Sequence, residues 1–327
     1  MRARIWLILL AALSLVSVVC NQPFEPRPPL QDQLVVFSIL STDRDAQFVR
    51  VERNYMPPDF SPQTYTSDNS LANAVVSLKD GNSTYDLHDT IFARPDTSRF
   101  KFPLRAYVLS PFVPQYGKSY EITVLSPELG RAVGKAIVPG KPMLAMGLSA
   151  RDVLASPGSY KDDEGIPFEA LLSDVTKGYI GRLFIDYSVL KGNGWVDGRI
   201  EVPIAYKYFD IHDFKYVINA QLTRRPTTHQ MNVAYTNQMY NAALIEVAYS
   251  RFPASKLVFS RIVYQFLQAE QNLYDYYQVA HAFNDPYSTR LDEPIYSNID
   301  GGVGVVGAYT LDSLVFPLPQ HFVYNRQ

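Results

Sequence analysis

The feature that most constrains the fold is a long alternation of apolar and polar residues in the middle of the chain. Residues 179–190 carry apolar side chains at every second position, at Leu183, Ile185, Tyr187 and Val189. Because residues two apart on a β-strand share one face, this spacing predicts a strand that is packed on one side only. After a turn at residues 192–194, the alternation resumes over residues 200–208. We therefore predict a long antiparallel hairpin.

Shorter strands of the same kind occupy the first part of the chain. Runs of β-prone residues lie at 34–40, 48–53, 74–78, 83–87, 117–124 and 132–138. Asp80-Gly81, between two of these runs, is a hairpin turn signal. This density of short strands predicts a small β-sandwich of immunoglobulin-like or transthyretin-like type over residues 33–140. Residues 139–142 read Pro-Gly-Lys-Pro and are predicted to link it to a second domain, 143–327.

The second domain is predicted to be β-rich with a single helix. Two further strands are expected at 241–249 and 257–268. Apolar side chains at helical spacing predict a helix over 270–284, which Pro286 ends: Leu273, Tyr277, Ala280 and Phe283. The predicted fold is therefore mainly β, with an N-terminal β-sandwich followed by a larger antiparallel β domain on which one helix packs.

The first twenty residues have the composition of an export signal. Two arginines precede an apolar run over residues 5–19, and the only cysteine of the chain, Cys20, follows. We predict a signal peptide over 1–19, lipidation of Cys20, and a Pro-rich tether over 20–32. The alternative is an ordinary secretory peptide with an incidental cysteine. The anchor predicts a membrane-attached lipoprotein.

Charge and hydropathy exclude some classes of partner. Removing residues 1–19 takes Lys+Arg from 30 to 28 against 32 acidic residues, so the formal charge moves from −2 to −4. This mild acidity provides no electrostatic footprint for nucleic acid. After residue 19, no apolar run approaches the ~20 residues that a membrane-spanning helix needs.

Residues 302–307 match the G-x-G-x-x-G pattern of dinucleotide-binding proteins. That fingerprint requires a strand before it, a helix after it and an acidic residue about twenty positions later. Only 20 residues follow Gly307, and they include Pro317 and Pro319. We therefore predict no cofactor, and interpret the glycines as permitting a bulged or closely packed strand: Gly301, Gly302, Gly304 and Gly307.

Metal-binding and catalytic patterns are weak. Asp210 and His212 would share a strand face, but a catalytic zinc needs three protein ligands. The acidic run 162–165 lacks the spaced ligands of a calcium loop. We predict no metal site and identify no catalytic residue. Paired carboxylates of the glycosidase kind stay open, because such pairs meet only in the fold.

Two aromatic groups are candidates for binding. Tyrosines crowd the predicted helix and its surroundings, and packing on a sheet is the favoured interpretation over a ligand groove: Tyr264, Tyr274, Tyr276, Tyr277 and Tyr287. The following loop, 284–298, carries Tyr287, Arg290 and Tyr296, which are residue types enriched at interface hot spots. We interpret these three as a candidate partner surface, the alternative being a loop that only routes the chain.

A late sequence block carries a family resemblance. Ser297-Asn298-Ile299 precedes the glycine run at 301–307, and Cys20 is followed by Pro23-Phe24-Glu25-Pro26. In this the chain resembles an uncharacterised envelope lipoprotein family of Bacteroidota, a domain of unknown function. Its members are often described near TonB-dependent outer-membrane transporters. The resemblance implies an outer-membrane lipoprotein, with the leaflet left open between cell surface and periplasmic face, and a transporter partner. It supplies no catalytic residues.

Three functions are consistent with the sequence. The first is a non-enzymatic binding or accessory component beside such a transporter. The second is a hydrolase of glycan or peptide whose site assembles only in three dimensions. The third is a structural or adhesive surface protein.

Overall fold

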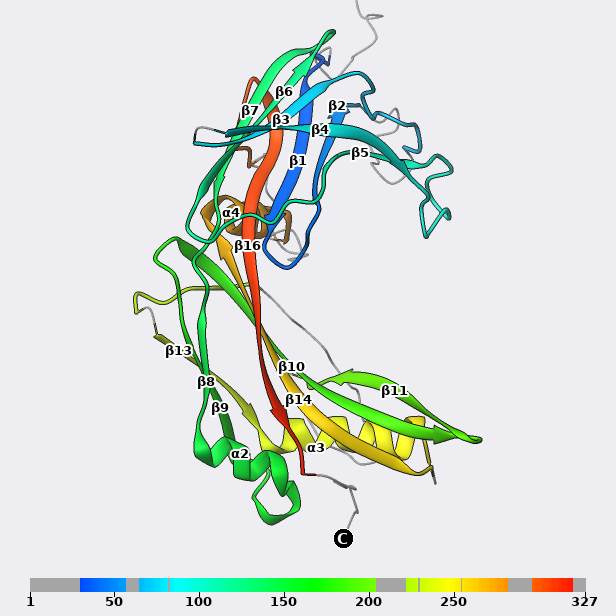
Figure 1. The fold of residues 1–327 in the computed structure, drawn as a ribbon, viewed down its shortest axis with the longest axis vertical. Helices are drawn as coiled ribbons and strands as arrows, with labels where there is room; N and C mark the ends of the chain where they lie inside the picture. The colour runs from blue at the N-terminus through cyan, green and yellow to red at the C-terminus, as the bar shows by residue number, and fades with distance from the viewer. Residues whose placement is uncertain are drawn as a thin grey trace, which may run out of the picture.

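The computed structural model describes residues 30–56, 65–81, 83–203, 222–228, 230–253, 255–281 and 296–319. Within these residues the fold is mainly β, with one 13-stranded mixed sheet and one 3-stranded sheet. Figure 1 shows an upper and a lower lobe joined by long strands. The prediction of a mainly β fold is confirmed.

The upper lobe is a continuous run of antiparallel strands that curls around one hydrophobic core. In spatial order the strands are β1 (Leu34–Ser41), β2 (Gln47–Arg53), β5 (Leu104–Leu109), β4 (Ser83–Phe92), β3 (Val75–Asp80), β6 (Ser119–Ser126) and β7 (Gly130–Ile137). Alternate residues on each strand face the core, as Val49 and Val51 do on β2. The predicted hairpin at Asp80-Gly81 is confirmed, and Gly81 takes the positive φ of +58° that such a turn needs.

The lower lobe packs the long hairpin against a second layer. The large sheet contributes β10 (Thr176–Lys191), β11 (Gly194–Glu201), β12 (Thr223–Arg224) and β14 (Leu257–Glu270). The small sheet contains β8 (Met143–Met146), β9 (Gly165–Leu171) and β13 (Gln230–Thr236). The predicted hairpin is present as β10 and β11, whose register pairs Ile185 with Ile200. Its second strand begins earlier than predicted, at Gly194, and ends at Glu201, while residues 204–208 of the predicted strand lie outside the described residues. Its four alternating apolar side chains are all buried.

Three helical segments cover the second core beside the small sheet, and the sequence analysis did not predict them. They are α2 (Leu148–Ala155), α3 (Asn237–Ile245) and the π-helix η3 (Glu246–Arg251), with a short 3-10 turn, η2 (Pro157–Ser159), after α2. The predicted strand over 241–249 is wrong, because this segment lies in α3 and η3. Side chains at i, i+3, i+4 and i+7 are fully buried there: Tyr240, Ala243, Leu244 and Val247. The Thr236 hydroxyl also caps α3 by accepting a hydrogen bond from the Met239 N–H.

The predicted helix near residues 270–284 is present as α4 (Gln271–His281). Its last three predicted residues lie outside the described part of the chain. The helix packs on the outer face of β16 (Gly302–Pro317), where a Cβ added to Gly307 would lie 2.9 Å from the Leu273 Cβ. None of the described helices is both long and apolar enough to cross a bilayer.

Strand β16 connects the two lobes (Figure 1). Its first half pairs in parallel with β1, with Leu34 opposite Gly302. Its second half pairs antiparallel with β14, with Arg261 opposite Pro317. Just before it, β15 (Ile299–Asp300) adds to the edge of β7. Residues 299–308 therefore pack in the first core, although they come from the range assigned to the second domain.

The glycine run lies within this strand and not in a strand–turn–helix unit. Gly304 has a φ of +121°, and a Cβ built on it would lie 2.1 Å from the Val36 carbonyl oxygen. A Cβ on Gly301 would lie 2.2 Å from the Arg131 carbonyl oxygen. The interpretation of these glycines as allowing close backbone packing is confirmed, because no side chain fits at either position.

Candidate functional site: a polar pocket

A polar pocket of about 550 Å³ opens where β7, β15 and the start of α4 meet. Its volume lies in the range of about 300–1,000 Å³ that is typical of small-molecule sites. The lining comes from four elements and the segment before β15: Glu121, Arg131, Val133, Lys135, Asn272, Asn298 and Asp300. All but Val133 are polar, so the pocket suits a charged or hydrogen-bonding ligand.

Strand register places the charged side chains on one face. Lys135 lies opposite Glu121 on β6, and Val133 lies opposite Asp300 on β15. The even-numbered residues of β7 point into the core, where Ala132 and Ala136 are buried. Period-two alternation therefore turns Arg131, Val133 and Lys135 outward together.

Asn298 joins the floor of the pocket to the core strand. Its Nδ2 donates to the Lys135 carbonyl oxygen at 3.0 Å and to the Val306 carbonyl oxygen at 2.7 Å. Its Oδ1 accepts from the Val306 N–H at 2.9 Å. One amide side chain thus links β7 to β16 and fixes the segment that carries Asp300.

The start of α4 closes the other side. Asn272 Nδ2 also donates to the Lys135 carbonyl oxygen, at 3.0 Å, and the Tyr296 hydroxyl donates to Asn272 Oδ1 at 2.8 Å. Burial, together with the nearby Asp275 and Glu270 carboxylates, raises the pKa of Tyr296 to about 12. Tyr296 therefore stays protonated at neutral pH and serves as a donor.

Glu270 anchors the helix beneath the pocket. Its carboxylate accepts hydrogen bonds from the backbone N–H groups of Asn272 at 2.8 Å, Leu273 at 2.9 Å and Ala308 at 3.3 Å. The first two contacts cap the N-terminus of α4, and the third ties the cap to β16. Burial raises the pKa of Glu270, while the three N–H donors oppose that rise.

Four charged residues line the pocket: two of them form an ion pair with each other, and two do not. Lys135 Nζ lies 3.0 Å from Glu121 Oε2. Arg131 and Asp300 form no ion pair with any residue that the structure describes. A ligand with one anionic and one cationic group would find a complementary partner for each. Across the described ranges, no group of three or more His, Cys, Asp or Glu side chains could hold a metal ion.

The sequence-predicted binding residues have different outcomes. Tyr296 supports the pocket through Asn272, whereas Tyr287, Arg290 and Cys20 lie outside the described residues, as do Asp210 and His212. The packing interpretation of the tyrosines is confirmed for two of them. The ring of Tyr264 is fully buried and stacks on Phe168 with 4.3 Å between ring centroids, and the ring of Tyr276 contacts Phe37 edge-on at 6.0 Å.

The lining residues themselves were missed by the sequence analysis. Alternation along residues 131–135 was a usable signal, because it places Arg131 and Lys135 on one strand face. Asn298 lies in the block at 297–299 that carries the family resemblance, but the sequence analysis assigned it no role. No local pattern connected these residues with Asn272 or Glu121.

Comparison with known proteins identifies one family whose model matches most of the chain. The family model described as "Domain of unknown function (DUF4249)" matches residues 21–314. No curated protein matches the chain. Among solved structures, the chain is similar to the C-terminal globular domain of an oligosaccharyltransferase from Pyrococcus abyssi, with 8% identity and a TM-score of 0.20. That match covers 70% of this chain and 43% of the other.

Proposed function

The chain belongs to the DUF4249 family, and from this, from the predicted export signal and from the polar pocket we propose that it is an envelope lipoprotein that binds a small zwitterionic ligand. In this proposal Cys20 carries the lipid anchor, and the protein works without catalysis beside a TonB-dependent outer-membrane transporter. The transporter part rests on the sequence resemblance given above. The binding part rests on the pocket.

The observation that carries the binding proposal is that Arg131 and Asp300 line one pocket, and neither forms an ion pair with a residue that the structure describes. A ligand carboxylate would accept hydrogen bonds from the Arg131 guanidinium, which suits planar anions. A ligand ammonium would donate to Asp300, and Asn272 lines the pocket with a further polar group. Free amino acids and short peptides carry both charges, so they are the ligand class that fits.

A hydrolase is the second candidate, because two carboxylates, Glu121 and Asp300, line the same pocket. Glycosidases use such a pair. Here, however, Glu121 is already engaged by Lys135. Binding without turnover is therefore the better fit to the arrangement.

The binding proposal is tested by calorimetric titration of the purified chain, residues 20–327, with zwitterionic amino acids and dipeptides. N-acetylated amides of the same compounds serve as ligand controls. Arg131→Gln and Asp300→Asn should each weaken binding about ten- to a hundredfold, since hydrogen bonds to charged groups contribute about 1.5–3 kcal/mol. Arg224→Gln and Asp163→Asn change exposed charges away from the pocket and should leave affinity unchanged. Equal heats for the amides and the zwitterions would remove this ligand class, and product formation would favour the hydrolase.

The anchor is tested separately, by metabolic labelling with a lipid probe and by Cys20→Ser. We expect the wild-type protein to be labelled and to sediment with membranes, and the variant to move to the soluble fraction. An unlabelled wild-type protein would contradict the anchor. A pull-down from solubilised outer membrane then checks whether a TonB-dependent transporter copurifies.

A further inference from the structure

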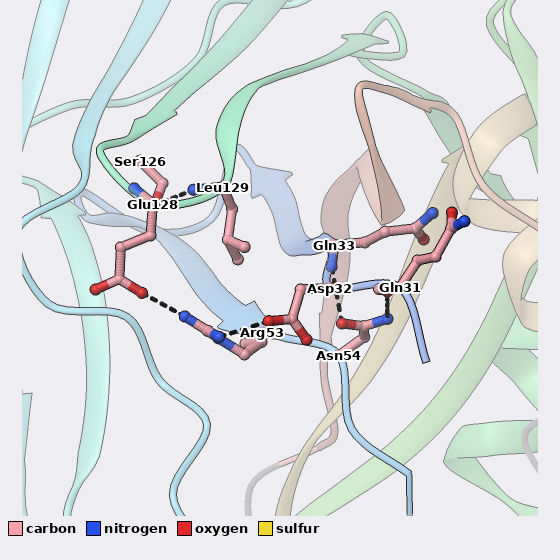
Figure 2. A network of polar contacts seen from close by, with 8 residues as sticks. All are labelled: Gln31, Asp32, Gln33, Arg53, Asn54, Ser126, Glu128 and Leu129. Carbon is pink, nitrogen blue, oxygen red and sulfur yellow. Dashed lines mark hydrogen bonds and ion pairs between the residues drawn. The ribbon is translucent and has the colours of Figure 1, made fainter. Parts of the chain in front are cut away.

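Hydrogen bonds fix the segment by which the chain enters the upper lobe, just before β1. Asn54 Nδ2 donates to the Gln31 carbonyl oxygen at 2.8 Å, and Asn54 Oδ1 accepts from the Gln33 N–H at 2.8 Å. The Asn54 N–H donates to the Gln33 carbonyl oxygen at 3.1 Å. These three hydrogen bonds hold the entering strand against the end of β2, and Figure 2 shows the two that the Asn54 side chain makes.

Arg53 extends this contact to a second part of the lobe. Its Nη1 donates to Asp32 Oδ2 at 2.7 Å, and its Nη2 pairs with the Glu128 carboxylate (Figure 2). Glu128 lies in the turn between β6 and β7, where the Ser126 hydroxyl accepts from the Glu128 and Leu129 N–H groups at 3.3 Å. The entering chain is thereby joined to two separate strand ends.

We name this region the entry end and define it as residues 30–33, 53–55, 75 and 125–129. It carries exposed apolar side chains, with exposed fractions of 41% for Leu30, 40% for Tyr55, 60% for Val75 and 45% for Leu125. Val75 and Leu125 are register partners across β3 and β6, so they lie side by side. Apolar and tyrosine side chains of this kind partition into the interfacial region of a bilayer.

The rest of the molecule extends away from the entry end. Strand β16 begins opposite Leu34 and continues for 16 residues, about 50 Å at the usual rise, to the lower lobe. The β10–β11 hairpin continues beyond it and carries Trp195, which is 53% exposed. By contrast, the ten residues from Cys20 to the entry end can span at most about 35 Å.

We propose that the entry end faces the lipid bilayer and that the β10–β11 hairpin stands away from it. The proposal rests on the anchor at Cys20 that forms part of the proposed function. The clamp formed by Arg53 and Asn54 gives the anchored body a preferred orientation, because the apolar side chains of the entry end lie beside the point where the tether arrives.

The test uses the single thiol of the chain, so that it does not depend on acylation in the cell. Residues 20–327 are coupled through Cys20 to a maleimide lipid in phosphatidylcholine vesicles that contain brominated lipid as a quencher. Trp195 is the only tryptophan after residue 19 and reports on the hairpin. A second protein, carrying Pro127→Trp with Trp195→Phe, reports on the entry end at an exposed position.

We expect strong quenching of the indole introduced by Pro127→Trp and none of Trp195. Quenching of Trp195 that equals or exceeds it would overturn the proposal. Arg53→Gln with Asn54→Ala, in the Pro127→Trp background, should reduce quenching, whereas Arg105→Gln removes an ion pair elsewhere in the same lobe and should not. The thermal transition of the double variant shows whether it is folded. If it is folded and its quenching is unchanged, the contacts of Arg53 and Asn54 do not orient the protein on the bilayer. A failed acylation assay with a positive quenching result would contradict only the native anchor.

Discussion

The side chain of Asn298 and the backbone of Val306 exchange two hydrogen bonds, of 2.7 Å and 2.9 Å, across the turn that leads into β16. The pair resembles the two backbone hydrogen bonds that opposite residues of antiparallel strands form with each other. A third hydrogen bond runs from Asn298 to the Lys135 carbonyl oxygen. A single side chain therefore fixes the geometry of the turn, the glycine run and the pocket.

Asn298→Ala should lower the free energy of unfolding by about 2–4 kcal/mol, because it removes these hydrogen bonds and leaves backbone groups without partners. Urea unfolding followed by circular dichroism measures the change. Asn193→Ala, in the exposed turn of the β10–β11 hairpin, is the matched control and should change stability little. A change below about 0.5 kcal/mol for both variants would contradict the role of Asn298.

Gly304→Ala should destabilise the protein by at least about 3 kcal/mol, and Gly304→Val should prevent folding. The φ of +121° disfavours any side chain, and the added Cβ would collide with the Val36 carbonyl oxygen. Gly158→Ala is the control, since no atom lies within 4 Å of its added Cβ. Thermal unfolding distinguishes the variants. Titration of the wild-type protein with NAD or FAD should produce no heat, and micromolar binding would contradict the structural interpretation of the run.

The stability difference between the wild type and Glu270→Gln should depend on pH. Burial raises the pKa of Glu270 in the folded state above the ordinary glutamate value of 4.5. The folded state therefore binds the proton more tightly, and this contribution to stability is complete below about pH 4.5 and is lost as pH rises through the folded pKa. Wild-type stability relative to the variant should accordingly fall as pH rises above 4.5. The other titrating groups are common to both proteins, so a difference that rises over the same interval would contradict the buried carboxyl.

Tyr264→Phe should leave stability unchanged or raise it by up to about 1 kcal/mol, because the buried Tyr264 hydroxyl has no hydrogen-bond partner among the residues that the structure describes. Tyr235→Phe is the matched comparison. Both rings contact Phe168, but the Tyr235 hydroxyl donates to the Gly181 carbonyl oxygen at 3.1 Å. Losing that bond should cost about 1 kcal/mol. Equal denaturation midpoints for the two variants would argue against this difference.

Sequence reasoning was strongest where local periodicity decides the outcome. Alternation identified the buried faces of β2, β6 and β10, and the turns at Gly81 and Gly192 followed from their neighbours. It failed at residues 241–249, where a run of small and apolar residues fits a strand as well as a helix. The Thr236 cap and burial on one helical face decided in favour of α3.

The sequence by itself determined which residues of β2, β6 and β10 face inward and that the run 301–307 allows close backbone packing, because both depend on the local backbone. The tertiary structure alone decided that β16 returns to pair with β1, and so brought Glu121, Arg131, Asn272 and Asp300 to one pocket. Such long-range pairing depends on closing a loop of more than 250 residues and on which surfaces then fit together. No local pattern records either of these.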